Sequence, residues 1–179
     1  MKGMTSLEAK AWCEKRSISV SENRFLHYGD LKLGFTIELP EKPYRLPAIA
    51  AWLLPDSEEA PFQGALLWVR EWGIWAEHTE EAGMKIMEAL RQAHGETRTL
   101  KAAPAMLFGP EELRDLHAFF IQPLLFGWDA FMVPASGEYF AFNSHDEVIC
   151  LVTKTEEKRG ALMRWLKGWE PEEEVSHYF

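Results

Sequence analysis

The clearest pattern in the chain is an alternation of apolar and polar positions between Leu31 and Leu39. Every second residue of this stretch is Leu, Phe or Ile, and the residues between them are Lys, Gly, Thr and Glu. A period of two predicts a β-strand with one buried face and one face toward water. The preceding segment 24–28 is separated from it by Gly29 and Asp30, a pair typical of a two-residue hairpin turn, so we expect the two segments to pair.

Apolar residues at helical spacing predict several helices. A capping box formed by Thr5 and Glu8 predicts a first helix that ends near Lys15. Pro123 removes a backbone N–H and is expected to kink or end a later, buried helix. The final helix, from Thr155 onward, is expected to cover the sheet with a face that includes two tryptophans. The helix that Pro123 is expected to kink or end spans 111–123, and the other predicted helices are a short one over 48–54 and one over 79–95.

The remaining apolar segments predict a sheet. The run 65–69 is apolar throughout, which favours a central strand covered on both faces. Three strand-like segments follow late in the chain, over 128–134, 138–143 and 147–153, and their short connections make neighbouring strands antiparallel. Helices and hairpin strands are segregated along the chain. We therefore predict an α+β fold with a mainly antiparallel sheet of about five strands, about four helices and a terminal βββα unit.

Length and composition favour one globular domain. The chain has 179 residues, 47% of them hydrophobic and 26% charged, and domains cluster around roughly 100–150 residues. We assign 1–170 to a single domain and 171–179 to an acidic, aromatic tail that is expected to fray. The first residues lack the apolar core of a signal peptide, and no apolar run is long enough to cross a membrane. These features predict a cytoplasmic protein that does not bind membranes.

The negative net charge of the chain excludes one class of partner and favours another. The net charge is −9, and no cluster of Lys and Arg occurs. Nucleic-acid binding depends on such residues to neutralise phosphates, so we expect no nucleic-acid partner. An acidic surface favours a basic partner, mainly by speeding association. The two cysteines, Cys13 and Cys150, have no metal or redox spacing, and we interpret them as small buried hydrophobes instead of a disulfide.

The first candidate site follows from the tryptophan content, which is eight residues. Trp68, Trp72 and Trp75 surround Arg70 and Glu71 where a strand runs into a glycine-containing loop. Because arginine stacks on aromatic faces, this segment could form a platform for a flat ligand or a peptide side chain. The alternative is that Trp68 and Trp75 lie in the core and that Arg70 pairs with Glu71 or another neighbour.

The second candidate site is the turn that contains Ser144, His145 and Asp146. A catalytic triad is not expected, because adjacent turn residues point in different directions and no nucleophile-elbow motif occurs. Ordinary hydrogen bonding within a turn explains these residue types, although His145 could serve as a single acid–base or contact residue. Asp129 shares its strand side with apolar residues. It is therefore expected to be partly buried and to pair with a cation, for which Arg70 is the candidate.

Metal and cofactor chemistry find no support in the sequence. Histidines 78, 94, 117 and 145 show no spacing typical of a metal site, and no glycine-rich phosphate motif occurs. We expect no metal and no cofactor.

Three functions remain as hypotheses. The first is a noncatalytic binding protein, of the general character of immunity or antitoxin proteins, that holds a protein partner or a small ligand in an aromatic groove as a monomer or homodimer. The second is a small hydrolase or transferase that uses His145, Asp146 and Asp129 in an aromatic cleft. The third is a dimerisation module that uses the face of Trp165 and Trp169.

Overall fold

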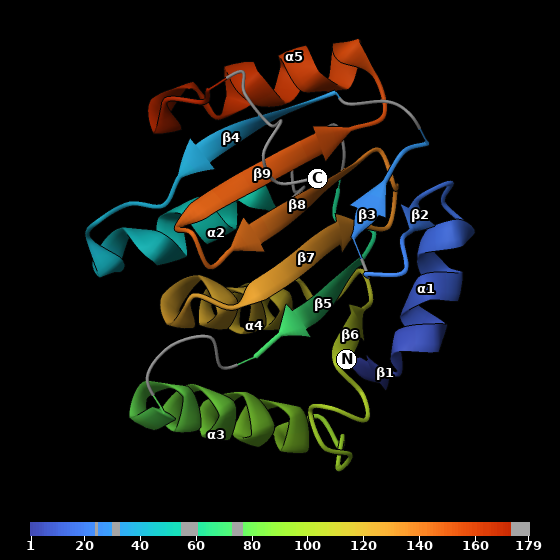
Figure 1. Ribbon diagram of the computed structural model, residues 1–179, viewed down its shortest axis with the longest axis vertical. Helices are drawn as coiled ribbons and strands as arrows, with labels where there is room; N and C mark the ends of the chain where they lie inside the picture. Colours follow the sequence, from blue (N-terminus) through green and yellow to red (C-terminus); the bar gives the residue numbers. More distant parts are fainter. Residues whose placement is uncertain (24, 30–32, 55–60, 73–76, 173–179) are drawn as a thin grey trace.

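A single antiparallel sheet with helices on both sides dominates the computed structural model, which describes residues 1–23, 25–29, 33–54, 61–72 and 77–172 (Figure 1). The sheet has seven strands in the order β1-β6-β5-β7-β8-β9-β4, and every neighbouring pair is antiparallel. Its strands are β1 (Lys2–Met4), β4 (Gly34–Glu38), β5 (Ala65–Glu71), β6 (Ala105–Phe108), β7 (Asp129–Pro134), β8 (Tyr139–Ser144) and β9 (Val148–Thr153). A separate two-stranded sheet joins β2 (Ser19–Val20) to β3 (Leu26–His27).

Two hydrophobic cores lie on opposite faces of the sheet. The first core packs under α2 (Leu46–Leu53), α3 (Glu77–Ala93) and α4 (Leu113–Phe126), and also receives residues of α5 (Glu156–Trp165). The second core packs under α1 (Ser6–Glu14) and the β2–β3 hairpin. Two short 3-10 helices, η1 (Pro43–Arg45) and η2 (Lys167–Trp169), precede α2 and follow α5.

Strand β5 lies inside the sheet, between β6 and β7. Ala65, Leu67 and Val69 belong to the first core, whereas Leu66 and Trp68 belong to the second. The apolar run therefore serves both faces, as its sequence predicted.

Several predictions from local sequence are confirmed. The fold is α+β with an antiparallel sheet, and its last part consists of β7, β8, β9 and α5 in that order. The side chain of Thr5 accepts a hydrogen bond from the Glu8 N–H, and the Glu8 carboxylate bonds the Thr5 N–H in return. The predicted numbers of strands and helices were too low. Strands of two or three residues, such as β1 and β2, carry too few positions to show a period.

The predicted hairpin around Gly29 is wrong. Strand β3 pairs with β2, and β4 pairs with β9. The wet face predicted for this strand is wrong in part, because Glu38 is exposed but Thr36 is buried and its backbone pairs with Glu172. Asp30 and the start of the predicted strand lie outside the described residues. Alternation shows which side chains share a face, but it does not show which strand becomes the neighbour.

Two further segments differ from expectation. Of the two outcomes expected at Pro123, the end of the helix does not occur, because α4 continues to Phe126 and is capped by Gly127, which has a positive φ of 61°. The Pro123 carbonyl lies in the last turn of the helix, and it accepts from the Asn143 side chain at 3.1 Å and from the Trp128 N–H at 3.0 Å. Trp165, expected to cover the sheet, is instead exposed.

The cysteines and the chain end complete the comparison. Cys13 and Cys150 are buried and free, as predicted, and burial raises the pKa of both thiols to about 12. None of the described helices is long and apolar enough to cross a membrane. In the predicted tail, the backbone of Glu172 pairs with that of Thr36 in β4. Residues 173–179 lie outside the described residues.

Strand β1 is fastened to the sheet by a surface ion pair, which gives a pH-dependent prediction. Arg98 donates to Glu96 through Nε at 2.9 Å and to the Gly3 carbonyl through Nη2 at 2.8 Å. The hydrogen bonds from Arg98 lower the pKa of Glu96 to about 2 from an ordinary 4.5. A carboxyl group whose pKa falls on folding stabilises the protein above its unfolded pKa, and this contribution disappears as the pH drops toward the folded value.

We therefore expect Glu96→Gln to be less stable than the wild type near neutral pH, with the difference shrinking as pH falls from about 4.5 toward 2. Urea unfolding of both proteins at several pH values within and above this window measures the difference. A difference that stays constant over the whole window would contradict the assignment. The other carboxyl groups are common to both proteins and cancel in the comparison.

Candidate functional site

A buried carboxylate joins three of the residues singled out in the sequence. Asp129, the first residue of β7, is 2% exposed. Its Oδ1 accepts from Nδ1 of His145 at 2.8 Å and from the His145 backbone N–H at 3.0 Å. Its Oδ2 lies 3.3 Å from Nη2 of Arg70. The ion pair expected between Arg70 and Asp129 is thus present, and His145 completes the cluster.

An irregularity in β5 directs Arg70 into this cluster. Val69 lies opposite Ala130 and Glu71 lies opposite Asp129, so Arg70 is the extra residue of a β-bulge. A bulge re-aims the side chain of its extra residue. The Arg70 guanidinium lies 4.2 Å from the centre of the Phe25 ring and 3.4 Å from the Glu71 carboxylate. The pairing of Arg70 with Glu71, which the sequence suggested as the alternative to a ligand platform, is therefore present.

The β8–β9 turn orients His145. Because an ionised carboxylate only accepts hydrogen bonds, the contact with Asp129 places a proton on Nδ1 of His145. Nε2 lies 3.7 Å from Oδ1 of Asp146. The Ser144 hydroxyl donates to Oδ2 of Asp146 at 3.3 Å and accepts from the Asp146 N–H at 3.2 Å. Ser144 thus bonds within its own turn, in agreement with the turn chemistry expected for it.

The tryptophan platform is not formed by the described residues. Trp68 is buried in the second core. Trp72 packs on the opposite face, against the first core, with its ring 4.9 Å from that of Trp128. Trp75 lies outside the described residues. The two described indoles do not face a common site, because Trp68 packs in the second core and Trp72, beyond the bulge at Arg70, packs against the first core on the other side of the sheet.

A different aromatic surface forms where α2 and η1 meet α5 and η2. Trp52 and Trp165 are 42% and 50% exposed, and their ring centres are 4.6 Å apart. Nε1 of Trp165 donates to the Trp52 carbonyl at 2.9 Å. Further along, the Arg45 guanidinium lies 4.7 Å from the Trp169 ring, beside the exposed Tyr44. We call these five residues the α2–α5 seam.

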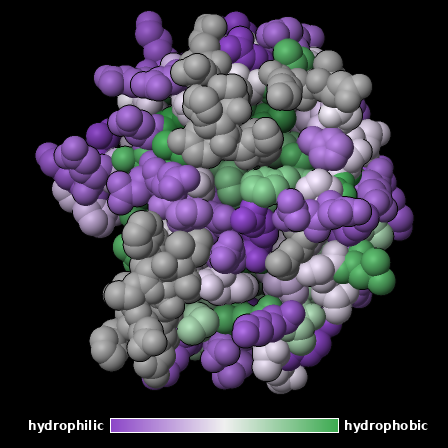
Figure 2. Space-filling view, in the orientation of Figure 1, coloured by the Kyte–Doolittle hydropathy of each residue, from purple (hydrophilic) through white to green (hydrophobic). Residues whose placement is uncertain are grey.

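A pocket of about 700 Å³ adjoins one end of the seam. It shares Tyr44, Arg45 and Trp169 with the seam. Its charged lining consists of four carboxylates and two cations, namely Glu38, Glu41, Glu170, Glu172, Lys42 and Arg45. Hydrophilic side chains also gather over the connection between β4 and α2, at the left edge of the molecule (Figures 1 and 2). The pocket is therefore acidic, with aromatic walls.

The fold brings together one group of metal-ligand type that the sequence spacing did not suggest. One ligand atom from each of His94, Glu112 and Asp115 lies within 4.8 Å of the others. Both oxygens of Glu112 are already engaged, since one bonds the Met1 amine and the other accepts from the Gly109 N–H at 2.8 Å. Because a metal would have to displace these partners, we assign no metal to this group.

Sequence reasoning found the Asp129 cluster but missed the seam. The signal for the seam was present in the two tryptophans of the last helix, but nothing in the sequence showed that Trp52 would meet them. The pocket at the seam is lined by residues other than those of the Asp129 cluster. The chain matches no protein-family model, no curated protein and no solved structure.

Proposed function

We propose that the protein is a noncatalytic binding protein that captures a basic segment of a partner protein at the α2–α5 seam. The observation that carries this proposal is the exposed Trp52–Trp165 pair beside an acidic, aromatic-walled pocket. Tryptophan, tyrosine and arginine are the residue types enriched among the energetically dominant contacts of protein interfaces.

The chemistry of the seam fits a segment that carries Lys or Arg. Four carboxylates face two cations in the adjoining pocket, and Arg45 already lies against the Trp169 ring. A basic side chain gains ion pairs with the carboxylates and cation–π contact with an exposed ring, worth about 0.5–2 kcal/mol per contact. The charge of −9 on the whole chain also speeds the approach of a basic partner.

The seam is preorganised for binding. Trp52 lies on α2 and Trp165 on α5, and the hydrogen bond from Trp165 to the Trp52 carbonyl fixes one ring relative to the other helix. Side chains that are ordered before binding lose less conformational entropy in the complex. The exposed rings therefore serve as ready-made anchors.

A peptide array that varies charge and apolar content tests the proposal. We expect the wild-type protein to select basic peptides, with affinity that falls as salt concentration rises. Replacing Trp52 and Trp165 together by alanine is expected to weaken binding about tenfold or more. The matched control is Ile86→Ala, which removes an exposed apolar side chain from α3.

Circular dichroism shows whether each variant is folded before its affinity is compared. Selection of acidic or uncharged peptides, or equal binding by wild type and the Trp52/Trp165 double variant, would refute the proposal. Equal binding by wild type and the Ile86 control is the expected outcome.

The Asp129 cluster favours a second candidate, acid–base catalysis in a hydrolase or transferase. The observation is the 2.8 Å hydrogen bond from His145 to Asp129, the contact by which a buried carboxylate orients a histidine base. Panels of activated esters and phosphoesters test it with wild type and His145→Gln. Turnover that disappears in the variant would favour the enzyme, and turnover at the same rate in both proteins would exclude His145 as its base.

A further inference from the structure

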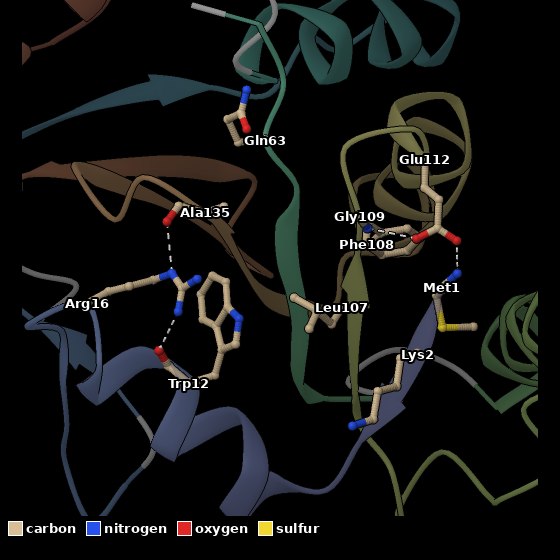
Figure 3. A pocket seen from close by; sticks show the side chains of 10 residues that line it. All are labelled: Met1, Lys2, Trp12, Arg16, Gln63, Leu107, Phe108, Gly109, Glu112 and Ala135. Carbon is tan, nitrogen blue, oxygen red and sulfur yellow. Dashed lines mark hydrogen bonds and ion pairs between the residues drawn. The ribbon is translucent and has the colours of Figure 1, made fainter.

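A second pocket lies beside α1. Residues of β1 and β6, at one end of the sheet, line it, whereas the pocket at the seam includes Glu38 of β4 at the other end. Its volume is about 470 Å³, within the range of small-molecule sites. Trp12 and Arg16 approach it on the side of α1, and Leu107 of β6 lies between them and the group of Gly109, Glu112 and Met1 (Figure 3). Strand β1 contributes Lys2. We call this cavity the α1 pocket.

Arg16 is the best-fixed cation of the α1 pocket. Its Nε donates to the Ala135 carbonyl at 2.9 Å, and Nη1 donates to the Trp12 carbonyl at 3.1 Å (Figure 3). The guanidinium lies 3.5 Å from the centre of the Trp12 ring. Gly137, with a positive φ of 63°, leaves the space for this side chain, because a Cβ there would lie 2.8 Å from Cβ of Arg16.

Within the described part of the chain, no acid balances the charge of Arg16. Its hydrogen-bond partners are neutral carbonyl groups, and no carboxylate among the described residues forms an ion pair with it. Lys2 adds a second cation to the lining. The carboxylate of the pocket, Glu112, is already neutralised by its ion pair with the Met1 amine. The α1 pocket is therefore locally positive in a chain whose net charge is −9.

We propose that the α1 pocket binds a small anionic molecule with a carboxylate or phosphate group on a flat or apolar body. The anionic group pairs with Arg16 and Lys2, and arginine is well suited to the planar geometry of a carboxylate or phosphate. The body packs against Leu107 and extends the stack of Arg16 on Trp12. This site goes beyond the seam function, because it uses different elements of the fold and a ligand of opposite charge.

Calorimetry with matched small molecules tests the site. The probes are aryl carboxylates, aryl phosphates, the corresponding neutral amides and the corresponding aryl amines. We expect saturable binding of an anionic probe, about tenfold or more weaker in Arg16→Met and also weakened in Lys2→Gln. The matched control is Lys15→Gln, which removes one exposed positive charge near the end of α1 without changing the pocket lining.

Response to the carboxylates or to the phosphates supports the site and identifies the anionic group. Equal affinity for the neutral or cationic probes, no saturable anionic probe, or unchanged binding in Lys2→Gln and Arg16→Met would overturn it. If Arg16→Met does not fold, the affinity of Lys2→Gln for the anionic probe is compared with that of Lys15→Gln. Weaker binding by Lys2→Gln then supports the site, and equal binding overturns it. The Trp52/Trp165 double variant should bind the probes as the wild type does, so a failure of the seam and a failure of this pocket are distinguishable.

Discussion

Replacing Asp129 with alanine is expected to lower the free energy of unfolding by about 3–5 kcal/mol. The carboxylate is 2% exposed, forms an ion pair with Arg70 at 3.3 Å, and accepts from the His145 ring and the His145 backbone N–H. Its removal leaves the Arg70 guanidinium, already mostly buried, without its main counter-charge. The loss of one partner from a buried ion pair costs far more than the pair contributes, because the remaining charge has been taken out of water.

Urea unfolding of Asp129→Ala and wild type measures this loss. The matched control is Asp146→Asn, which changes an exposed carboxylate beside the same histidine and is expected to cost less than about 1 kcal/mol. The double variant with Arg70→Met should recover part of the loss, since it removes the orphaned cation as well. Equal destabilisation by Asp129→Ala and Asp146→Asn would show that the cluster contributes little to stability.

Replacing Arg91 with methionine is expected to raise the free energy of unfolding by about 1–4 kcal/mol. Arg91 lies in the last turn of α3 and is 1% exposed. None of its three guanidinium nitrogens has a hydrogen-bond partner among the described residues. Burial lowers the pKa of the guanidinium, and Glu96, the acid that counteracts this lowering most, is already bonded to Arg98. Methionine fills a similar space without a buried charge.

The matched control for this prediction is Arg98→Met. Arg98 has carboxylate and carbonyl partners, so its replacement is expected to destabilise the protein. Thermal unfolding of the two variants against wild type therefore gives shifts of opposite sign. A destabilised Arg91→Met would contradict this prediction. If added phosphate or sulfate then stabilised the wild type more than the variant, a bound anion would be the partner of Arg91.

Predictions from local sequence were reliable where the stabilising interactions join residues that are close together in the chain. The Thr5–Glu8 capping box closes a helix end with side chains three residues apart. The short helix predicted over 48–54 forms as α2, which begins two residues earlier at Leu46, because Pro47 in its first turn has no N–H to satisfy. The three antiparallel strands at the end of the chain followed from connections too short for any other arrangement.

The Asp129 cluster was predictable in part. A carboxylate among apolar strand residues signals burial, and burial requires a cation, which made Arg70 a reasonable partner. The bulge that turns Arg70 toward Asp129 left no mark in the sequence, because it depends on how β5 and β7 register against each other. The pairing of β7 with β8, in which Ala130 lies opposite Asn143, brings the β8–β9 turn and His145 to the carboxylate.

The positions of the tryptophans relative to one another could not be predicted from the sequence. Trp68 and Trp72 are close in sequence but lie on opposite faces of the sheet, whereas Trp52 and Trp165 are far apart in sequence and touch. Both pockets are also lined by segments from distant parts of the chain. A single sequence records periodicity and composition, and neither reports which faces of different elements meet.

By itself, the sequence determined the α+β class, the main helices and the antiparallel order of the last three strands, because these depend on side-chain period, caps and turn length. Only the tertiary structure decided that β4 pairs with β9, that Asp129 meets His145, and that the exposed tryptophans gather at the α2–α5 seam. These contacts are long-range. They are selected by the burial of whole faces against one another, a property of the assembled chain and not of any local segment.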